Sequence, residues 1–97
     1  MAEADSGTTR IHVVVRGRVQ GVGFRWFVRE LARGLDLAGW VKNREDGSVE
    51  VVAEGSERSV QSLMAQLRQG PPGATVHGVE LLAATGFEVA RPFAIVR

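Results

Sequence analysis

Apolar and polar residues alternate along this chain with two different periods, and these periods divide it into strands and helices. Residues 11–16 are mostly β-branched and predict a buried strand. After a glycine-rich segment, apolar side chains recur at the spacing of one helix face. They are Phe24, Phe27, Val28, Leu31, Ala32 and Leu35. This spacing predicts a helix of about three turns that stops near Gly34 and Asp36.

The second half of the chain predicts a hairpin, a second helix and two further strands. The strands are expected over residues 37–43, 48–54, 75–84 and 93–96. Asp46 and Gly47 form a strong hairpin signal between the first two of them. Ser56 is a suitable N-cap for the helix, which ends at the glycines and prolines of residues 70–73. The apolar face of this helix consists of Val60, Leu63, Met64 and Leu67.

The order of these elements is strand, helix, strand, strand, helix, strand, with a short fifth strand at the end. This order predicts an α+β domain of the ferredoxin-like split βαβ type. Two helices should cover one face of an antiparallel sheet of four to five strands. In this topology the first two strands run in the same direction and the third lies between them. Asn43, at the end of the second strand, is therefore expected on the same rim as the segment after the first strand, roughly 10 Å away.

The segment between the first strand and the first helix is suited to binding an anion. Gly17, Gly21 and Gly23 allow tight turns that aim several backbone N–H groups at one point. The segment leads into a helix N-terminus, which carries about half a positive charge and unpaired N–H donors. Arg25 lies in the first turn, where a cation costs about 0.3–1 kcal/mol unless an anion is bound nearby. We therefore expect Arg25 and Asn43 to reach one phosphate-sized ligand.

Composition and charge restrict the class of protein. The chain has 97 residues, no cysteine and a net charge of +1, so it forms one small domain without disulfides or thiol chemistry. We expect residues 1–9 to be a disordered tail and residues 10–97 to be the domain. Without a run of about 20 apolar residues or a secretory signal, a cytoplasmic protein with no membrane partner is expected. Five arginines and no acid from Ser6 to Arg29 favour a small anionic ligand over a long polyanion.

Three segments closely resemble the acylphosphatase family. They are Gly-Arg-Val-Gln-Gly-Val-Gly-Phe-Arg at 17–25, Gly-Trp-Val-Lys-Asn at 39–43 and Asp-Gly-Ser-Val-Glu at 46–50. The resemblance extends over the chain from Ile11 onward and implies the ferredoxin-like fold. It also implies an enzyme that hydrolyses small-molecule acyl phosphates to a carboxylate and phosphate, without a metal or any other cofactor.

The same resemblance implies the residues of the site. It gives catalytic roles to Arg25 and Asn43. It implies that the substrate phosphate is bound by the backbone of Arg18, Val19, Gln20, Gly21, Val22 and Gly23. Two positions depart from the family pattern, since Asp36 replaces a usual glycine and Thr75 stands where arginine is common. Neither is expected to touch the site.

Two other functions stay open at this point. A non-catalytic module on the same fold would bind phosphate or an anion like carbamoyl phosphate, and the same motif opens a larger carbamoyl-transfer maturation protein. Because the pattern of the fold is complete and zinc-finger cysteines are absent, we expect a stand-alone, monomeric enzyme. Binding of single-stranded RNA needs exposed aromatic residues on the central strands. The first strand has His12 and valines instead, so no nucleic-acid partner is expected.

The other notable polar and aromatic residues are expected to be structural or solvent-facing. His12 and His77 do not have the spacing of metal ligands. Trp26 lies off the apolar face of the first helix and should be partly exposed. Asp46 and Glu50, with Glu45, are expected to form a solvated turn and strand face.

Overall fold

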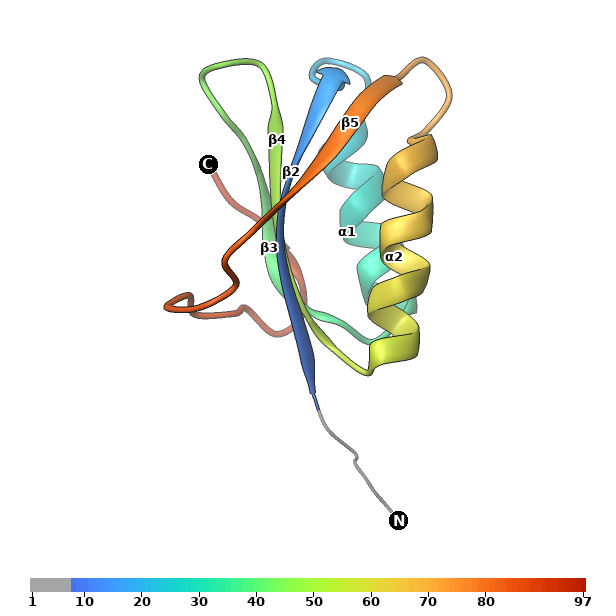
Figure 1. Cartoon of the computed structure of the whole chain (residues 1–97). Helices are drawn as coiled ribbons and strands as arrows, with labels where there is room; N and C mark the ends of the chain where they lie inside the picture. The colour runs from blue at the N-terminus through green and yellow to red at the C-terminus, as the bar shows by residue number, and fades with distance from the viewer. Residues whose placement is uncertain (1–7) are drawn as a thin grey trace.

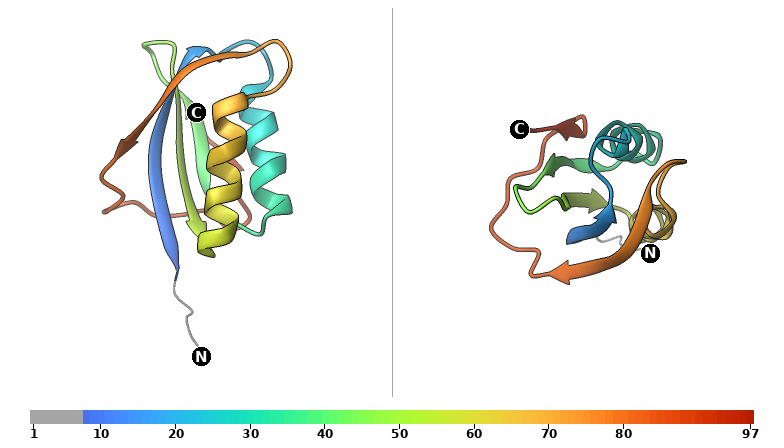
Figure 2. Two further views of the ribbon diagram at one scale, coloured as in Figure 1. Left: turned by 45° about the vertical axis from the view of Figure 1, so that its right-hand side comes forward. Right: turned by 90° about the horizontal axis from the view of Figure 1, so that it is seen from above.

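A five-stranded sheet with two helices makes up residues 8–97, the part of the chain that the computed structural model describes (Figure 1). The strands are β2 (Thr9–Arg18), β3 (Ala38–Asn43), β4 (Val49–Gly55), β5 (Thr75–Leu82) and β6 (Ala94–Ile95). The helices are α1 (Phe24–Gly34) and α2 (Glu57–Gln69). Both helices lie on the same face of the sheet, as the view from above in Figure 2 shows. The predicted ferredoxin-like α+β fold is confirmed.

The strands lie in the order β5-β2-β4-β3-β6. β4 is antiparallel to both of its neighbours, β2 and β3, which therefore run in the same direction, as predicted. β6 pairs with β3 in parallel, so the sheet is mixed and not wholly antiparallel as expected. The physical reason is the path of the chain. It leaves β5 at the end of the sheet where β3 begins, crosses over, and enters the edge in the direction of β3 (Figure 1).

The ends of the elements follow local backbone chemistry. The hydroxyl of Ser56 accepts a hydrogen bond from the N–H of Ser59 and caps α2, as predicted. After α1, Asp36 adopts a left-handed φ of 58°, which aspartate tolerates better than most residues. β2 begins at Thr9, the last residue of the predicted tail, whose residues 1–7 lie outside the described part. No helix within residues 8–97 is long and apolar enough to cross a membrane.

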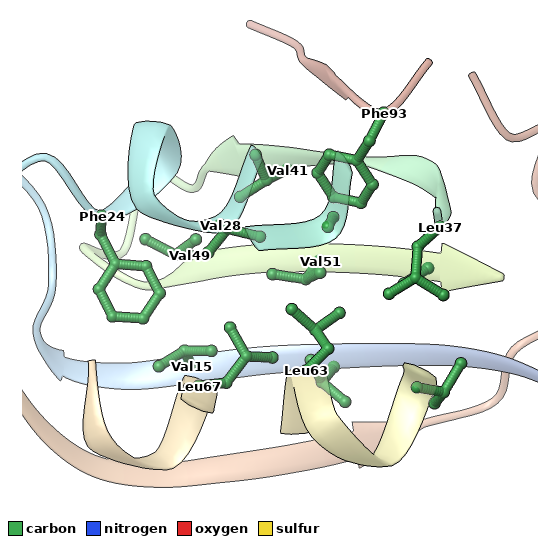
Figure 3. Close-up of a cluster of buried hydrophobic side chains, with 14 of the residues drawn as sticks. Val15, Phe24, Val28, Leu37, Val41, Val49, Val51, Leu63, Leu67 and Phe93 are labelled. Atoms are coloured by element: carbon green, nitrogen blue, oxygen red, sulfur yellow. The ribbon is translucent and has the colours of Figure 1, made fainter. Parts of the chain in front are cut away.

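The hydrophobic core lies between the helices and the facing side of the sheet (Figure 3). Its buried side chains include Val15, Val41, Val49 and Val51 from the strands and Phe24, Val28, Leu63 and Leu67 from the helices. Phe24 is the first residue of α1, so core packing fixes the place where this helix begins. Phe93, just before β6, is also buried in this core and holds the end of the chain against β3.

The opposite face of the sheet contacts the segment between β5 and β6. His12 is 6% exposed there, with Nε2 2.6 Å from a carboxylate oxygen of Glu50 and Nδ1 3.1 Å from the carbonyl oxygen of Ala83. The ring of Phe87 packs edge-on against His12 and against Trp40. His12 is thus structural, as expected. The prediction of a solvated Glu50 is wrong, because its carboxylate is used in this largely buried pair.

Gly39, near the start of β3, lies where β3 packs closely against β4. Its φ is +138°, and a Cβ there would overlap the carbonyl group of Val52. We expect Gly39→Ala to lower the free energy of unfolding by about 3 kcal/mol or more, because the clash and the strained backbone act together. Urea denaturation measures this loss.

Gly34→Ala is the matched control. A Cβ at Gly34 would meet nothing within 4 Å, and alanine in a helix is more favourable than glycine by up to about 1 kcal/mol. We therefore expect this variant to unfold at the same or a slightly higher urea concentration than wild type. Equal stabilities for the two variants would contradict the close approach of β3 and β4.

Candidate active site

Two connections meet at one end of the sheet. Residues 18–23, the glycine loop, lead from the end of β2 into α1, and residues 44–48, the hairpin turn, join β3 to β4. Both lie at the top of the view in Figure 1. Val41 is buried in the core beneath the helices, so Asn43, two residues further along β3, belongs to the same face of the sheet. The structure therefore brings Asn43 and the glycine loop to one rim, on the side where α1 starts.

Valine and glycine residues give the glycine loop its shape. Val19 is fully buried and Val22 packs against the core, so the loop is anchored at two points. Gly21 and Gly23 have φ values of +75° and +77°, a left-handed conformation that glycine adopts without strain. A Cβ at either glycine would meet nothing within 4 Å, so the surface of the loop is open at both positions.

The first turn of α1 lacks the groups that usually neutralise a helix N-terminus. Its N-cap, Gly23, offers no side-chain acceptor, and no residue of the described turn is acidic. α2 is the opposite case, because Ser56 caps it and Glu57 lies in its first turn. With Arg25 as its second residue, α1 therefore presents positive charge and N–H donors to an external anion.

Six consecutive backbone N–H groups in the glycine loop and the first turn of α1 lack an acceptor in the described part of the chain. Within residues 8–97, no hydrogen bond is donated by the backbone N–H groups of residues 20–25. The N–H of Phe27 does bond, to the carbonyl oxygen of Gly23 at 3.0 Å, and starts the regular pattern of the helix. A run of adjacent N–H groups is therefore available to a bound anion, as the glycine pattern predicts.

Most of the neighbouring arginines are neutralised by acids. The ion pairs are Arg10–Glu54, Arg16–Glu80, Arg16–Asp46 and Arg29–Glu30. Arg18 and Arg25 form no ion pair with any residue in the range 8–97. Of the five arginines from Arg10 to Arg29, the two without an ion pair to residues 8–97 thus lie in the glycine loop and in the first turn of α1. Arg29 also lies over the ring of Trp26, which is 59% exposed, in agreement with the prediction.

The side chain of Gln20 joins the glycine loop to the hairpin turn. Its Nε2 donates hydrogen bonds to the carbonyl oxygen of Arg44 at 2.7 Å and to that of Ser48 at 2.9 Å. The sequence prediction uses only the backbone of Gln20 and misses this contact. The topology predicts that both segments share a rim, but the sequence carries no signal for which carbonyl groups face the loop.

Hydrogen bonds to Asp46 hold the hairpin turn. Its Oδ1 accepts from the hydroxyl and from the backbone N–H of Ser48, and its Oδ2 lies 3.3 Å from Nη1 of Arg16. These contacts, the Ser48 hydroxyl above all, lower the pKa of Asp46 from 3.8 to about 2. Glu80 and Asp46 together raise the pKa of the Arg16 guanidinium. Asp46 is solvent-exposed, as expected.

A shallow open depression adjoins Asn43 beside the hairpin turn. It is lined by Lys42, Asn43, Arg44, Glu45, Asp46, Glu50 and Arg97. None of these lining residues belongs to the glycine loop, so the depression lies beside the anion-binding surface and not within it. It gives solvent direct access to the end of β3.

Comparison with known proteins identifies the family. The family described as Acylphosphatase matches residues 11–95. The chain belongs to the acylphosphatase family. An acylphosphatase from Bacillus subtilis is 45% identical over 84 residues, which cover 87% of this chain and 92% of that protein. One from Pseudomonas paraeruginosa is 53% identical over 73 residues, which cover 75% of this chain and 80% of that protein.

Solved structures agree with this family. The crystal structure of acylphosphatase from Bacillus subtilis has a TM-score of 0.83 at 43% identity, covering 91% of this chain and 98% of that chain. HypF from T. kodakarensis has a TM-score of 0.73 at 36% identity, but the match covers 12% of that chain. The domain therefore occurs both as nearly a whole protein and as a small part of a larger one. Family membership makes this chain a hydrolase of the acylphosphatase class.

The lowered pKa of Asp46 predicts how stability changes with pH. The ionised carboxylate stabilises the folded turn, so its contribution is fully present above about pH 5 and is lost as the pH falls through the folded-state pKa of about 2. We expect the stability difference between wild type and Asp46→Asn to be constant above about pH 5 and to vanish only near about pH 1. Urea denaturation at a series of pH values measures this difference. Glu45→Gln, which removes another carboxylate from the same turn, is the control, and a pH-independent difference for Asp46→Asn would contradict the assignment.

Proposed function

We propose that this site hydrolyses an acyl phosphate to a carboxylate and inorganic phosphate. The observation that carries the proposal is the uncapped start of α1, where unpaired N–H groups and Arg25 share a rim with Asn43. The acylphosphatase relatives support the same reaction. We also propose a monomeric enzyme, because the glycine loop, Arg25 and Asn43 all come from one chain. A cytoplasmic location stays a prediction.

The phosphoryl group lies against the glycine loop in this mechanism. Backbone N–H groups of residues 20–25 donate to its oxygens, and the guanidinium of Arg25 adds two parallel donors and a full positive charge. At the transition state of phosphoryl transfer, negative charge spreads over the equatorial oxygens. Donors that the loop and the helix already hold in place stabilise this charge without reorganising.

Asn43 positions the attacking water. Its side-chain amide does not take up a proton at neutral pH, so it is not a general base and acts through hydrogen bonds alone. The water oxygen forms a bond to phosphorus from the Asn43 side while the bond to the acyl oxygen breaks on the opposite side. The carboxylate leaves with the bonding electron pair, and the proton of the water passes to a phosphate oxygen or to solvent.

The nature of the leaving group explains why so few side chains are enough. A carboxylate departs without being protonated, so the reaction requires no general acid. Direct attack by water requires no covalent nucleophile, and the proposed steps use no metal ion or organic cofactor. What is left is positioning and charge stabilisation, which the N–H groups, Arg25 and Asn43 provide.

A second candidate function is a non-catalytic module that binds phosphate or an anion like carbamoyl phosphate. The match to HypF from T. kodakarensis favours it, because the domain there is 12% of a larger chain. An assay of phosphate release from benzoyl phosphate and acetyl phosphate separates the two functions. Release with turnover supports the enzyme, and saturable binding of inorganic phosphate without turnover supports the module.

Substitution of Arg25 tests phosphate binding. We expect Arg25→Gln to lower kcat/KM for benzoyl phosphate at least about 100-fold, through both a lower kcat and a higher KM. The reason is that the guanidinium contacts the phosphoryl group throughout the reaction. Arg29→Gln is the matched control on the same helix, since Arg29 is paired with Glu30. It should stay within about threefold of wild type. Wild-type values of kcat and KM in Arg25→Gln would show that Arg25 does not bind the phosphoryl group.

Substitution of Asn43 tests the placement of water. We expect Asn43→Ala to lower kcat at least about 100-fold and to change KM less than about threefold, because the amide holds water and not phosphate. Lys42→Ala is the control, since the neighbouring residue of β3 lies on the opposite face of the sheet. Steady-state kinetics with benzoyl phosphate measure both constants. A higher KM with an unchanged kcat in Asn43→Ala would exclude the proposed role.

A further inference from the structure

We propose that the side chain of Gln20 is a positioning residue, which sets the glycine loop at the correct distance from the water held by Asn43. This inference rests on the proposed hydrolysis of acyl phosphates. It assigns to Gln20 a role separate from its backbone N–H, which belongs to the phosphate-binding surface. The role is exerted through the hairpin turn and not through contact with the substrate.

The geometry of the Gln20 amide is fully determined by its partners. Both partners, the backbone carbonyls of Arg44 and Ser48, accept hydrogen bonds only, so the nitrogen end of the amide must face them. The two distances, 2.7 Å and 2.9 Å, are those of good hydrogen bonds. Both hydrogens of the Gln20 amide are thus used, and this side chain is half-buried.

The two carbonyl groups belong to the neck of the hairpin, directly beside Asn43. Arg44 follows Asn43 in the chain, and Ser48 precedes Val49, the residue that pairs with Asn43 across β3 and β4. The Ser48 carbonyl also accepts the backbone N–H of Arg44 at 2.9 Å, so both attachment points belong to one closed turn. A shift of this neck relative to the loop therefore moves Asn43 relative to the bound phosphoryl group.

Gln20 provides the direct hydrogen-bonded link across this gap. Among residues 8–97, no other hydrogen bond joins the glycine loop, residues 18–23, to the hairpin turn, residues 44–48. The nearest alternative is the exposed pair of Arg16 and Asp46, at 3.3 Å, which starts from β2 and not from the loop. A displacement of about 1 Å in a reacting group can cost a factor of about 100 in rate, so this link has kinetic consequences.

The test is a kinetic comparison of Gln20→Met, which keeps the length of the side chain and removes both donors, with wild type. We expect kcat for benzoyl phosphate to fall about tenfold or more, while the inhibition constant of inorganic phosphate changes less than about threefold. Gln61→Met is the matched control, because it removes a side-chain hydrogen bond to Glu57 on the outer surface of α2. Gln20→Asn, which keeps the amide but falls short of the carbonyls, should reproduce the loss if Gln20→Met folds poorly.

A double-substitution cycle separates positioning from stability. If Gln20 acts through Asn43, adding Gln20→Met to Asn43→Ala should lower kcat by less than about twofold further. If Gln20→Met lowered kcat about tenfold in the Asn43→Ala background as well, the inference would be overturned. A wild-type kcat in Gln20→Met alone would also overturn it. Both of those results leave the proposed function standing, provided that wild type releases phosphate and Asn43→Ala does so with a kcat at least about 100-fold lower. Absence of phosphate release by wild type would instead refute the proposed function itself.

Discussion

The uncapped start of α1 is the constraint on which the rest of the site depends. A helix end with free N–H donors and an arginine in its first turn is unfavourable by itself and would ordinarily fray or acquire a cap. Phe24 opposes fraying, because its ring is buried in the core together with Val28 one turn further along. Core packing thus holds the positive end of the helix open at the rim of the sheet, and a bound anion is the partner that relieves it.

The sheet supplies the second half of the site through its topology. Because β4 lies between β2 and β3, the ends of β2 and β3 reach the same rim although α1 separates them in the sequence. Gly39 allows β3 to lie close against β4, and Gly17 allows β2 to lie close against β5, since a side chain at either position would collide with the backbone of the neighbouring strand. Backbone geometry therefore places the glycine loop and Asn43, and Gln20 bridges the distance that remains between the loop and the hairpin turn.

Hydrophobic periodicity and turn chemistry are enough to predict the elements, the place of β4 between β2 and β3, and the rim shared by the glycine loop and Asn43, because these are local or topological properties. The segment between β5 and β6 has no such period, so the sequence does not indicate its contacts with the far face of the sheet. The burial of His12 and Glu50 and the direction of β6 both depend on that path. The contact of Gln20 depends on which carbonyl groups of the turn face the loop, a matter of register that residue type does not encode.

Positive charge alone does not make such a site catalytic. The product phosphate presents the same oxygens as the phosphoryl group of the substrate, so the N–H groups and Arg25 bind both. Groups that bind substrate, transition state and product equally change affinity without raising kcat. The acceleration must come from contacts that improve as charge spreads over the equatorial oxygens, and from a water aligned with phosphorus by Asn43. Further free arginines would mainly retain the product, and the pairing of Arg10, Arg16 and Arg29 with acids leaves Arg18 and Arg25 as the arginines of this region without an ion pair to residues 8–97.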